Sequence, residues 1–237
     1  DKPKFKETTL LDKMLPTLAS LPDDHFAVNF VRNRKIPEKM LQELYFIDDI
    51  SRVGQLNPKY AERIKYTEPR LVIPIRNRQG KLIALECRAF GDVNPRIKYM
   101  TIKLAEDETY VYGIDQVDFS KTIYVLEGPI DSMFLHTAVA VGNSDLRIPF
   151  KRRMLPKETS ILIFDNQPRN KEITRHVVGS ANQGYNIVIW PESIDGKDIN
   201  DLVLAGFSEK EILDIINNNN YSGPQAVLAA TNWRKSS

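Results

Sequence analysis

Four short hydrophobic runs dominate the second half of the chain, and their apolar residues do not alternate with polar ones. They read "TIYVLEG" from residue 122, "AVAVGN" from 138, "SILIFDN" from 160 and "YNIVIWP" from 185. Uninterrupted apolar runs are typical of strands buried on both faces, and the segments between them are long enough for helices. The pattern predicts an α/β fold with a parallel sheet and flanking helices.

The first half of the chain has a different pattern. "PEKMLQELYF" places Met40, Leu41, Leu44 and Tyr45 at helical spacing after Pro37, which predicts a helix. From Arg70, "RLVIPIRNRQGKLIALECRAF" contains two strand-like runs joined by a polar turn with a glycine, which predicts a β-hairpin.

Acidic residues follow three of the four hydrophobic runs. Glu127 follows the first run, Asp165 the third, and Asp198 lies in the loop after the fourth, while Asp131 comes four residues after Glu127. The carboxyl ends of parallel strands share one edge of a sheet, so we expect these acids to converge there. Taken singly, each could be an ordinary turn or N-cap residue. Together they predict a site for Mg²⁺ or Mn²⁺, because crowded carboxylates favour a hard cation between them.

Composition restricts the classes of protein considered. The chain is 42% hydrophobic and 27% charged, as in ordinary globular proteins. Its single cysteine allows no internal disulfide and no cysteine-built zinc site, which favours a reducing, intracellular setting. No apolar run is long enough to span a membrane, and the amino end lacks a signal-peptide pattern. The chain does not begin with Met, so we expect it to be a fragment of something longer.

Positive charge is concentrated between residues 68 and 103, where eight bases accompany three acids. Arg88, Arg96 and Lys98 belong to this region. A polyanion such as nucleic acid suits such a surface, and an ordinary solvated face explains it equally well. Arg152 and Arg153 form a second basic group after the second hydrophobic run, with the same two interpretations.

Together these motifs resemble a known family. A hydrophobic strand followed by Glu-Gly-x-x-Asp, a later strand ending in Asp, and "KDIND" after another strand resemble the Toprim domain of primases, topoisomerases and some nucleases. The upstream segment "IPIRNRQGKLIALECRAFGDVNPRIKYMT" and the later "YVYGID" resemble the catalytic core of DnaG-type primases. The similarity runs from about residue 70 to 204, and "FDNQPRN" is most similar to the primases of T-even-type bacteriophages.

The resemblance implies a role for each matching residue. Glu127, Asp165 and Asp198 would be catalytic and would hold the metal, with Asp131 as a further metal or phosphate-site acid. Nucleic acid or nucleotide would be bound by Arg88, Arg96 and Lys98. Arg152 and Arg153 are further nucleic-acid candidates on their charge alone. The implied activity is that of a DNA-directed RNA polymerase, which joins ribonucleotides into short primers on single-stranded DNA for replication.

Two departures from the family pattern concern the metal. Where the family usually has Asp-x-Asp, this chain has Asp165, Asn166 and Gln167, and Asn200 replaces another acid in the next loop. Neutral amides are weaker ligands than carboxylates, which argues against a strongly held second metal.

The resemblance also implies an organisation and partners. We expect a helical tether and the start of a basic subdomain in 1–67, the basic primase subdomain in 68–118, a Toprim domain in 119–206 and a helical segment in 207–237. The expected partners are a single-stranded DNA template, ribonucleoside triphosphates and a hexameric replicative helicase. Zinc would belong to a module that this chain lacks. A cytoplasmic location is expected, in the host cytoplasm if a bacteriophage encodes the protein.

Two other functions remain open, a nuclease and a non-catalytic scaffold. A Toprim nuclease would use the same acids to cleave nucleic acid. Its upstream region need not resemble a primase, so the primase-like segment in this chain counts against a nuclease. A topoisomerase needs a strand-cleaving tyrosine in a separate large domain, for which there is no room. A non-catalytic scaffold that binds DNA or helicase is favoured by the amides at positions 167 and 200.

Overall fold

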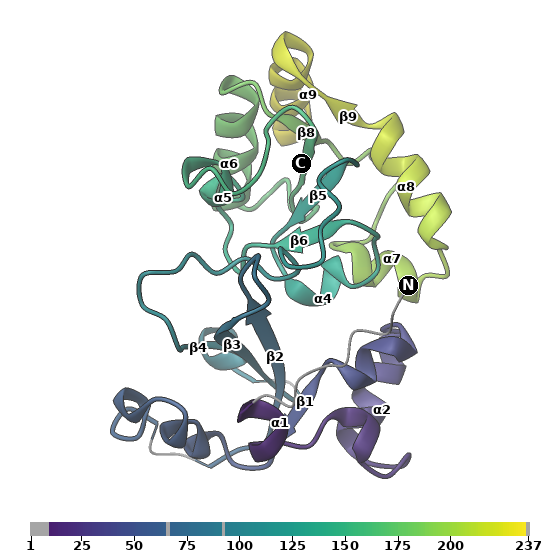
Figure 1. The fold of residues 1–237 in the computed structure, drawn as a ribbon. Coiled ribbons are helices and arrows are strands. Elements are labelled where there is room, and N and C mark those ends of the chain that lie inside the picture. Colours follow the sequence, from purple (N-terminus) through teal and green to yellow (C-terminus); the bar gives the residue numbers. More distant parts are fainter. Residues whose placement is uncertain (1–9, 65–66, 92, 236–237) are drawn as a thin grey trace. The chain divides into compact units, whose positions relative to one another are not determined.

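The computed structural model describes residues 10–64, 67–91 and 93–235. The chain divides into two compact units, which are described separately (Figure 1). The first consists of residues 1–74 and 83–106, and the second of residues 75–82 and 107–237. Within the described ranges, none of the helices has both the length and the apolar character needed to cross a membrane.

The first unit is built on a four-stranded sheet in which neighbours follow the order of the sequence. Its strands are β1 (Tyr45–Ile47), β2 (Arg70–Arg76), β3 (Leu82–Ala89) and β4 (Tyr99–Lys103). Its α-helices are α1 (Leu10–Met14), α2 (Phe26–Asn33) and α3 (Pro95–Lys98). Short 3-10 helices occupy Leu18–Ser20, Glu38–Gln42, Ile50–Gln55 and Pro58–Tyr60. The hairpin predicted from Arg70 is confirmed as β2 and β3, which are joined by a turn closed by the Gly80 N–H on the Asn77 carbonyl (2.8 Å).

The helix predicted after Pro37 is wrong in its second half. Only Glu38–Gln42 is helical, and Pro37 lies just before it. Tyr45 instead enters β1, where it pairs with Val72 and is fully buried. The run Tyr-Phe-Ile favours a strand, and in β1, paired with β2, Tyr45 and Ile47 are both buried.

The second unit contains the predicted parallel sheet. Its strands are β5 (Ile123–Leu126), β6 (Ala138–Ala140), β7 (Ser160–Ile163), β8 (Asn186–Val188) and β9 (Asn220–Tyr221). Their order is β6-β5-β7-β8-β9; the first four are parallel, and β9 is antiparallel to β8. The four hydrophobic runs are therefore confirmed as parallel strands whose carboxyl ends lie along one edge.

Helices surround this sheet and create its core. They are α4 (Pro129–Ser132), α5 (Ile148–Lys151), α6 (Lys171–Asn182), α7 (Ile199–Leu204), α8 (Glu209–Asn218) and α9 (Gly223–Lys235). Helices α6 and α9 pack against each other and against β8, whereas α4 packs on β5, β6 and α7 (Figure 1). A capping box begins α8, with the Ser208 hydroxyl accepting from the Glu211 N–H.

The outer edge of β6 is covered by the segment that precedes the sheet. The Tyr112 N–H donates to the Ala140 carbonyl (2.8 Å), and the Ala140 N–H donates back (3.1 Å). Gly113 follows with a φ of 80°, and a Cβ at this position would lie 2.8 Å from the Ala138 carbonyl oxygen. Only glycine allows the backbone to approach this closely, which explains the Tyr-Gly sequence here.

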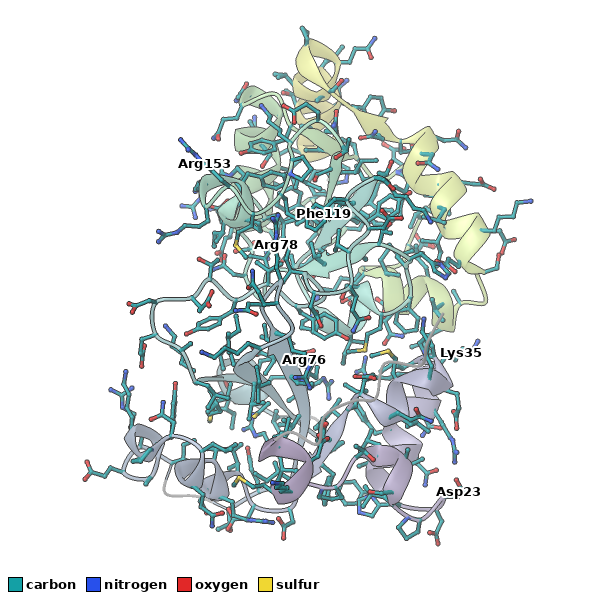
Figure 2. The ribbon with its side chains drawn as sticks, viewed as in Figure 1. Asp23, Lys35, Arg76, Arg78, Phe119 and Arg153 are labelled. Carbon is teal, nitrogen blue, oxygen red and sulfur yellow. The ribbon has the colours of Figure 1, made fainter. Side chains whose placement is uncertain are left out.

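The tip of the β2–β3 hairpin belongs to the second unit. The Arg78 guanidinium lies 4.3 Å from the centre of the Phe119 ring and donates a hydrogen bond to the Met154 carbonyl (Figure 2). These contacts attach the tip to the segments that lead into β5 and β7.

Candidate functional site

Glu127 comes directly after β5, at the carboxyl edge of the sheet. Its backbone carbonyl accepts from the Gly142 N–H (2.8 Å), which fixes the point where the strand ends. Gly128 caps α4 and Pro129 begins it, so the chain turns sharply behind the Glu127 side chain. One carboxylate oxygen, Oε1, is buried and has no hydrogen-bond partner among the described residues. A buried oxygen of this kind is costly unless something else binds it.

Three other acids reach the same edge from different elements. Asp165 follows β7, and Asp198 is the N-cap of α7, where its Oδ1 accepts from the Asp201 N–H (2.9 Å). Asp131 lies in α4, and its Oδ1 accepts from the Asn200 N–H (2.9 Å), which links α4 to α7.

A small recess brings these four acids together. Its lining comprises Leu126, Glu127, Asp131, Ile163, Phe164, Asp165, Trp190, Asp198 and Ile199. The structure therefore places all four predicted acids around one recess at the carboxyl ends of the strands, where the sequence pattern predicted them. Within the described ranges, no three His, Cys, Asp or Glu side chains are already arranged as a metal-binding group.

Burial and mutual repulsion change the proton affinity of these acids. Burial, together with the charge of Asp165, raises the pKa of Glu127 to about 7. Burial and the neighbouring Asp198 raise the pKa of Asp131, and burial also raises the pKa of Asp198. A cation in the recess would relieve both effects, because it favours the ionised form of every carboxylate.

Asp165 has two partners that the sequence motifs do not indicate. The Lys197 ammonium lies 2.9 Å from Asp165 Oδ2, and the Gln167 amide donates to the same oxygen (3.2 Å). Burial disfavours the charge on Lys197, but the hydrogen bond and ion pair with Asp165 outweigh it and raise the pKa of Lys197. The available signal was the position of Lys197 in "KDIND", next to Asp198.

Asn166 joins the loops that follow β7 and β8. Its amide nitrogen donates to the carbonyls of Ile194 (2.9 Å) and Gly196 (3.2 Å), and its backbone N–H donates to the Lys197 carbonyl (2.6 Å). The residue between Asp165 and Gln167 therefore fixes the loop that carries Lys197 and Asp198.

A larger cleft of about 790 Å³ lies next to the recess, and Trp190 lines both. The two loops joined by Asn166 form much of its wall, and Trp233 of α9 contributes too. Asn170 in this wall caps α6 and donates its amide to Gln167 Oε1 (2.9 Å). The side-chain amides of Asn166 and Asn170 thus hold the loops of the cleft wall in place.

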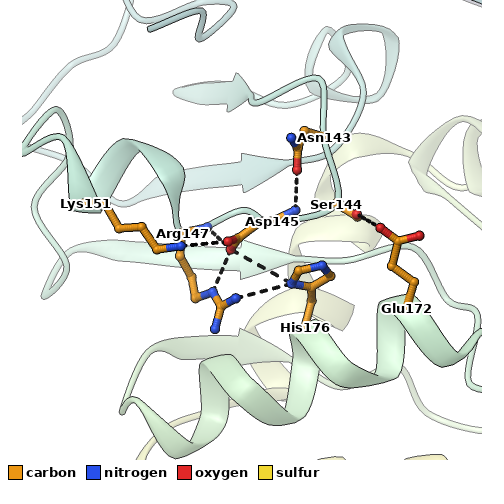
Figure 3. Close-up of polar contacts among 7 residues, drawn as sticks. All are labelled: Asn143, Ser144, Asp145, Arg147, Lys151, Glu172 and His176. Carbon is orange, nitrogen blue, oxygen red and sulfur yellow. Dashed lines mark hydrogen bonds and ion pairs between the residues drawn. The ribbon is translucent and has the colours of Figure 1, made fainter.

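A polar network fixes the loop after β6, on the same edge of the sheet (Figure 3). Asp145 accepts from the Arg147 guanidinium (2.6 Å) and the Lys151 ammonium (2.8 Å). Burial alone would raise the pKa of Asp145, but these hydrogen bonds lower it well below its usual range. The Ser144 hydroxyl donates to Glu172 Oε1 (2.8 Å), which ties the loop to α6.

The basic residues predicted in the first unit are less exposed than the sequence suggested. Arg88 is only 2% exposed; it donates to the Tyr99 hydroxyl (3.2 Å) and lies over the Phe30 ring. Lys98 ends α3 and is half-buried, and the Arg96 side chain lies outside the described residues. Arg70, counted in the basic excess, is fully buried, and it forms an ion pair with Glu68 and bonds to backbone carbonyls. Strand pairing turns Arg70 and Arg88 inward, so the basic surface is smaller than the count implied.

In the second unit, Arg152 and Arg153 are exposed directly after α5, and Figure 2 labels Arg153. Arg153 has a φ of 54°, in the left-handed region that non-glycine residues adopt uncommonly. Both side chains are accessible to a phosphate backbone.

Comparison with known proteins gives one strong sequence match. The DNA primase of Enterobacteria phage T4 is 31% identical over 241 residues, covering 98% of this chain and 68% of that protein. No family model matches the chain.

Solved structures share the fold at much lower identity. The Escherichia coli primase catalytic core aligns with a TM-score of 0.64 and 16% identity, over 93% of this chain and 80% of that one. A DnaG primase catalytic domain bound to single-stranded DNA has a TM-score of 0.64 and 16% identity, over 90% and 77%. These matches confirm the predicted architecture, with a Toprim-type parallel sheet.

Proposed function

Because this chain belongs to the family of DNA primases, we propose that it builds its RNA primers at the recess where Glu127, Asp165 and Asp198 meet. The supporting observation is that four separate elements deliver carboxylates to one recess, with Glu127 Oε1 buried and unpaired among the described residues. Nuclease, topoisomerase and scaffold functions are not favoured, because the sequence match is to a primase over nearly the whole chain.

The donor set suits a divalent cation with oxygen ligands. Glu127 Oε1, Asp165 and Asp198 would hold Mg²⁺ or Mn²⁺, while Asp131 is engaged with the Asn200 N–H. When bound, the cation would neutralise charge on the triphosphate of the incoming ribonucleotide.

The protein's own share is positioning and proton transfer. With Oε1 on the cation, the second carboxylate oxygen of Glu127, Oε2, would accept the proton of the primer 3′-hydroxyl. Asn166 holds the loop that carries Asp198, so this side of the recess stays fixed. The network around Asp145 holds the loop after β6, on the same edge of the sheet.

We further propose that the substrates are ribonucleoside triphosphates, that a single-stranded DNA template contacts Arg96, Lys98, Arg152 and Arg153, and that a hexameric helicase delivers that template. Arg88 is 2% exposed and packs inside the first unit, so it is not among these contacts. A DnaG domain has been solved with single-stranded DNA, which supports the template proposal. We retain 119–206 as the proposed Toprim domain, with the proposed basic subdomain in 68–118.

The test is extension of an RNA oligonucleotide annealed to single-stranded DNA, with ribonucleotides and Mg²⁺. This assay does not require the protein to choose a start site. Glu127→Gln should reduce extension at least 100-fold, since loss of a catalytic acid/base typically costs about 10²–10⁴ in rate. The matched control is Glu192→Gln, an exposed carboxylate in the loop after β8. Equal extension by both variants would refute the assignment, and cleavage of the DNA without extension would indicate a nuclease.

A further inference from the structure

Lys197 occupies a specific place within the acidic edge. Its ammonium lies 2.9 Å from Asp165 Oδ2, and its charge also acts on Glu127, Asp131 and Asp198. The Lys197 side chain is 52% exposed, whereas that of Asp165 is 20% exposed. One half-exposed ammonium is therefore held against a group of largely buried carboxylates.

The backbone around Lys197 is fixed, although its side chain is long and flexible. The Lys197 carbonyl accepts from the Asn166 N–H (2.6 Å), and the Lys197 N–H donates to Asp201 Oδ2 (3.1 Å). The loop before it is held by the Asn166 amide on the carbonyls of Ile194 and Gly196. The ammonium is thus aimed at Asp165 from a fixed anchor and can swing away without any change in the loop.

The oxygen that Lys197 contacts, Asp165 Oδ2, already has two donors. Asp165 Oδ2 accepts from both Lys197 and the Gln167 amide. An ammonium and a divalent cation on one carboxylate repel each other strongly, because both are within a few ångströms. A metal that used Asp165 fully would therefore compete with Lys197.

We propose that Lys197 is a built-in cation of the acidic edge, which pairs with Asp165 in the metal-free protein and leaves Asp165 Oδ2 when a divalent cation binds. This rests on the proposed function, because it takes the recess as the metal site. Lys197 is a positioning residue in this scheme: it limits repulsion among the acids and reduces the affinity for metal. An ordinary surface ion pair would have no effect on metal affinity.

The first experiment is calorimetric titration of Mn²⁺ into the wild-type chain and three variants. Lys197→Met should bind Mn²⁺ about 3- to 10-fold more tightly. In the wild type the metal must break the ion pair of a half-exposed lysine, which weakens metal binding by up to about a factor of ten. Lys197→Arg should bind within about twofold of the wild type. Lys210→Met, which removes the same charge from an exposed position on α8, should not change the affinity.

The outcomes distinguish the two proposals. If the wild type binds Mn²⁺ and Lys197→Met binds it equally or more weakly, the role of Lys197 is refuted and the metal site stands. If the wild type binds no Mn²⁺, both are refuted.

The second experiment uses the unaltered protein and does not depend on the folding of a variant. Reductive methylation of lysines is followed by mass spectrometry with and without Mn²⁺. Release from Asp165 should make Lys197 methylate several-fold faster when Mn²⁺ is present, while Lys210 keeps its rate. An unchanged or slower methylation rate at Lys197 would overturn the proposal that the divalent cation displaces Lys197 from Asp165.

Discussion

Glu127 should make the metal-free protein less stable as the pH rises. Its pKa is about 7 in the folded protein against 4.5 for an ordinary glutamate, because the side chain is buried beside Asp165. Each pKa unit corresponds to about 1.36 kcal/mol, so ionising Glu127 costs about 3 kcal/mol more in the folded protein than in the unfolded chain.

The sign follows from proton binding. Between pH 4.5 and about 7 the folded protein keeps the proton on Glu127, whereas the unfolded chain has lost it. The free energy of unfolding therefore falls as the pH rises through this window, and the full cost is present above it. Glu127→Gln has no carboxyl group to ionise, so at pH 8 it should exceed the wild type in stability by up to about 3 kcal/mol. Toward pH 4 the two should converge.

The assay is urea unfolding between pH 4 and 8 in buffer with a metal chelator. Glu192→Gln serves as the control, since its carboxylate is exposed, and it should follow the wild type at every pH. The reasoning fails if Glu127→Gln has the same pH dependence as the wild type, or if it is less stable at pH 8.

Other predictions concern the loops and the basic surface. Asn166→Ala should speed amide exchange in residues 194–197 and cost about 0.5–1.5 kcal/mol of stability, because two half-buried carbonyls lose their donor; unchanged exchange would contradict the role of Asn166 as a link between loops. Asp145→Asn should lower the free energy of unfolding at pH 7; this difference should begin to shrink as the pH falls below the ordinary pKa of 3.8 and disappear only below the lowered pKa of the folded protein, because the lowered pKa stabilises only the ionised form. Binding of single-stranded DNA weakens with salt, and the slope of log binding constant against log salt concentration counts phosphate contacts. In the double variant Arg152→Ala and Arg153→Ala, measured by fluorescence anisotropy, the magnitude of this slope should fall by about 1.4, or about 0.7 per phosphate contact. An unchanged slope would indicate that neither arginine contacts phosphate.

The sheet and its acidic edge could be predicted because one physical rule connects them. Apolar runs without alternation indicate strands buried on both faces, such strands are parallel, and parallel strands end at one edge. The position of each acid relative to its run then places Glu127, Asp165 and Asp198 together before any coordinates are known.

Features that depend on contacts between distant segments could not be predicted. The position of Lys197 depends on hydrogen bonds from Asn166, which lies 28 to 31 residues before the loop residues that it fixes. Tyr45 follows a helical spacing, and its strand depends on β2 as a pairing partner. Arg70 and Arg88 are charged in the sequence, yet the first sheet buries both and supplies their partners.

The most direct test of the central claim is a crystal structure of the chain soaked in Mn²⁺, with anomalous diffraction used to locate the metal. The proposed site predicts a peak in the recess, about 2.0–2.3 Å from Glu127 Oε1 and from carboxylate oxygens of Asp165 and Asp198. The Lys197 ammonium should then have moved away from Asp165 Oδ2. A strong peak elsewhere, with the recess empty and Lys197 still paired to Asp165, would contradict both the site and the exchange.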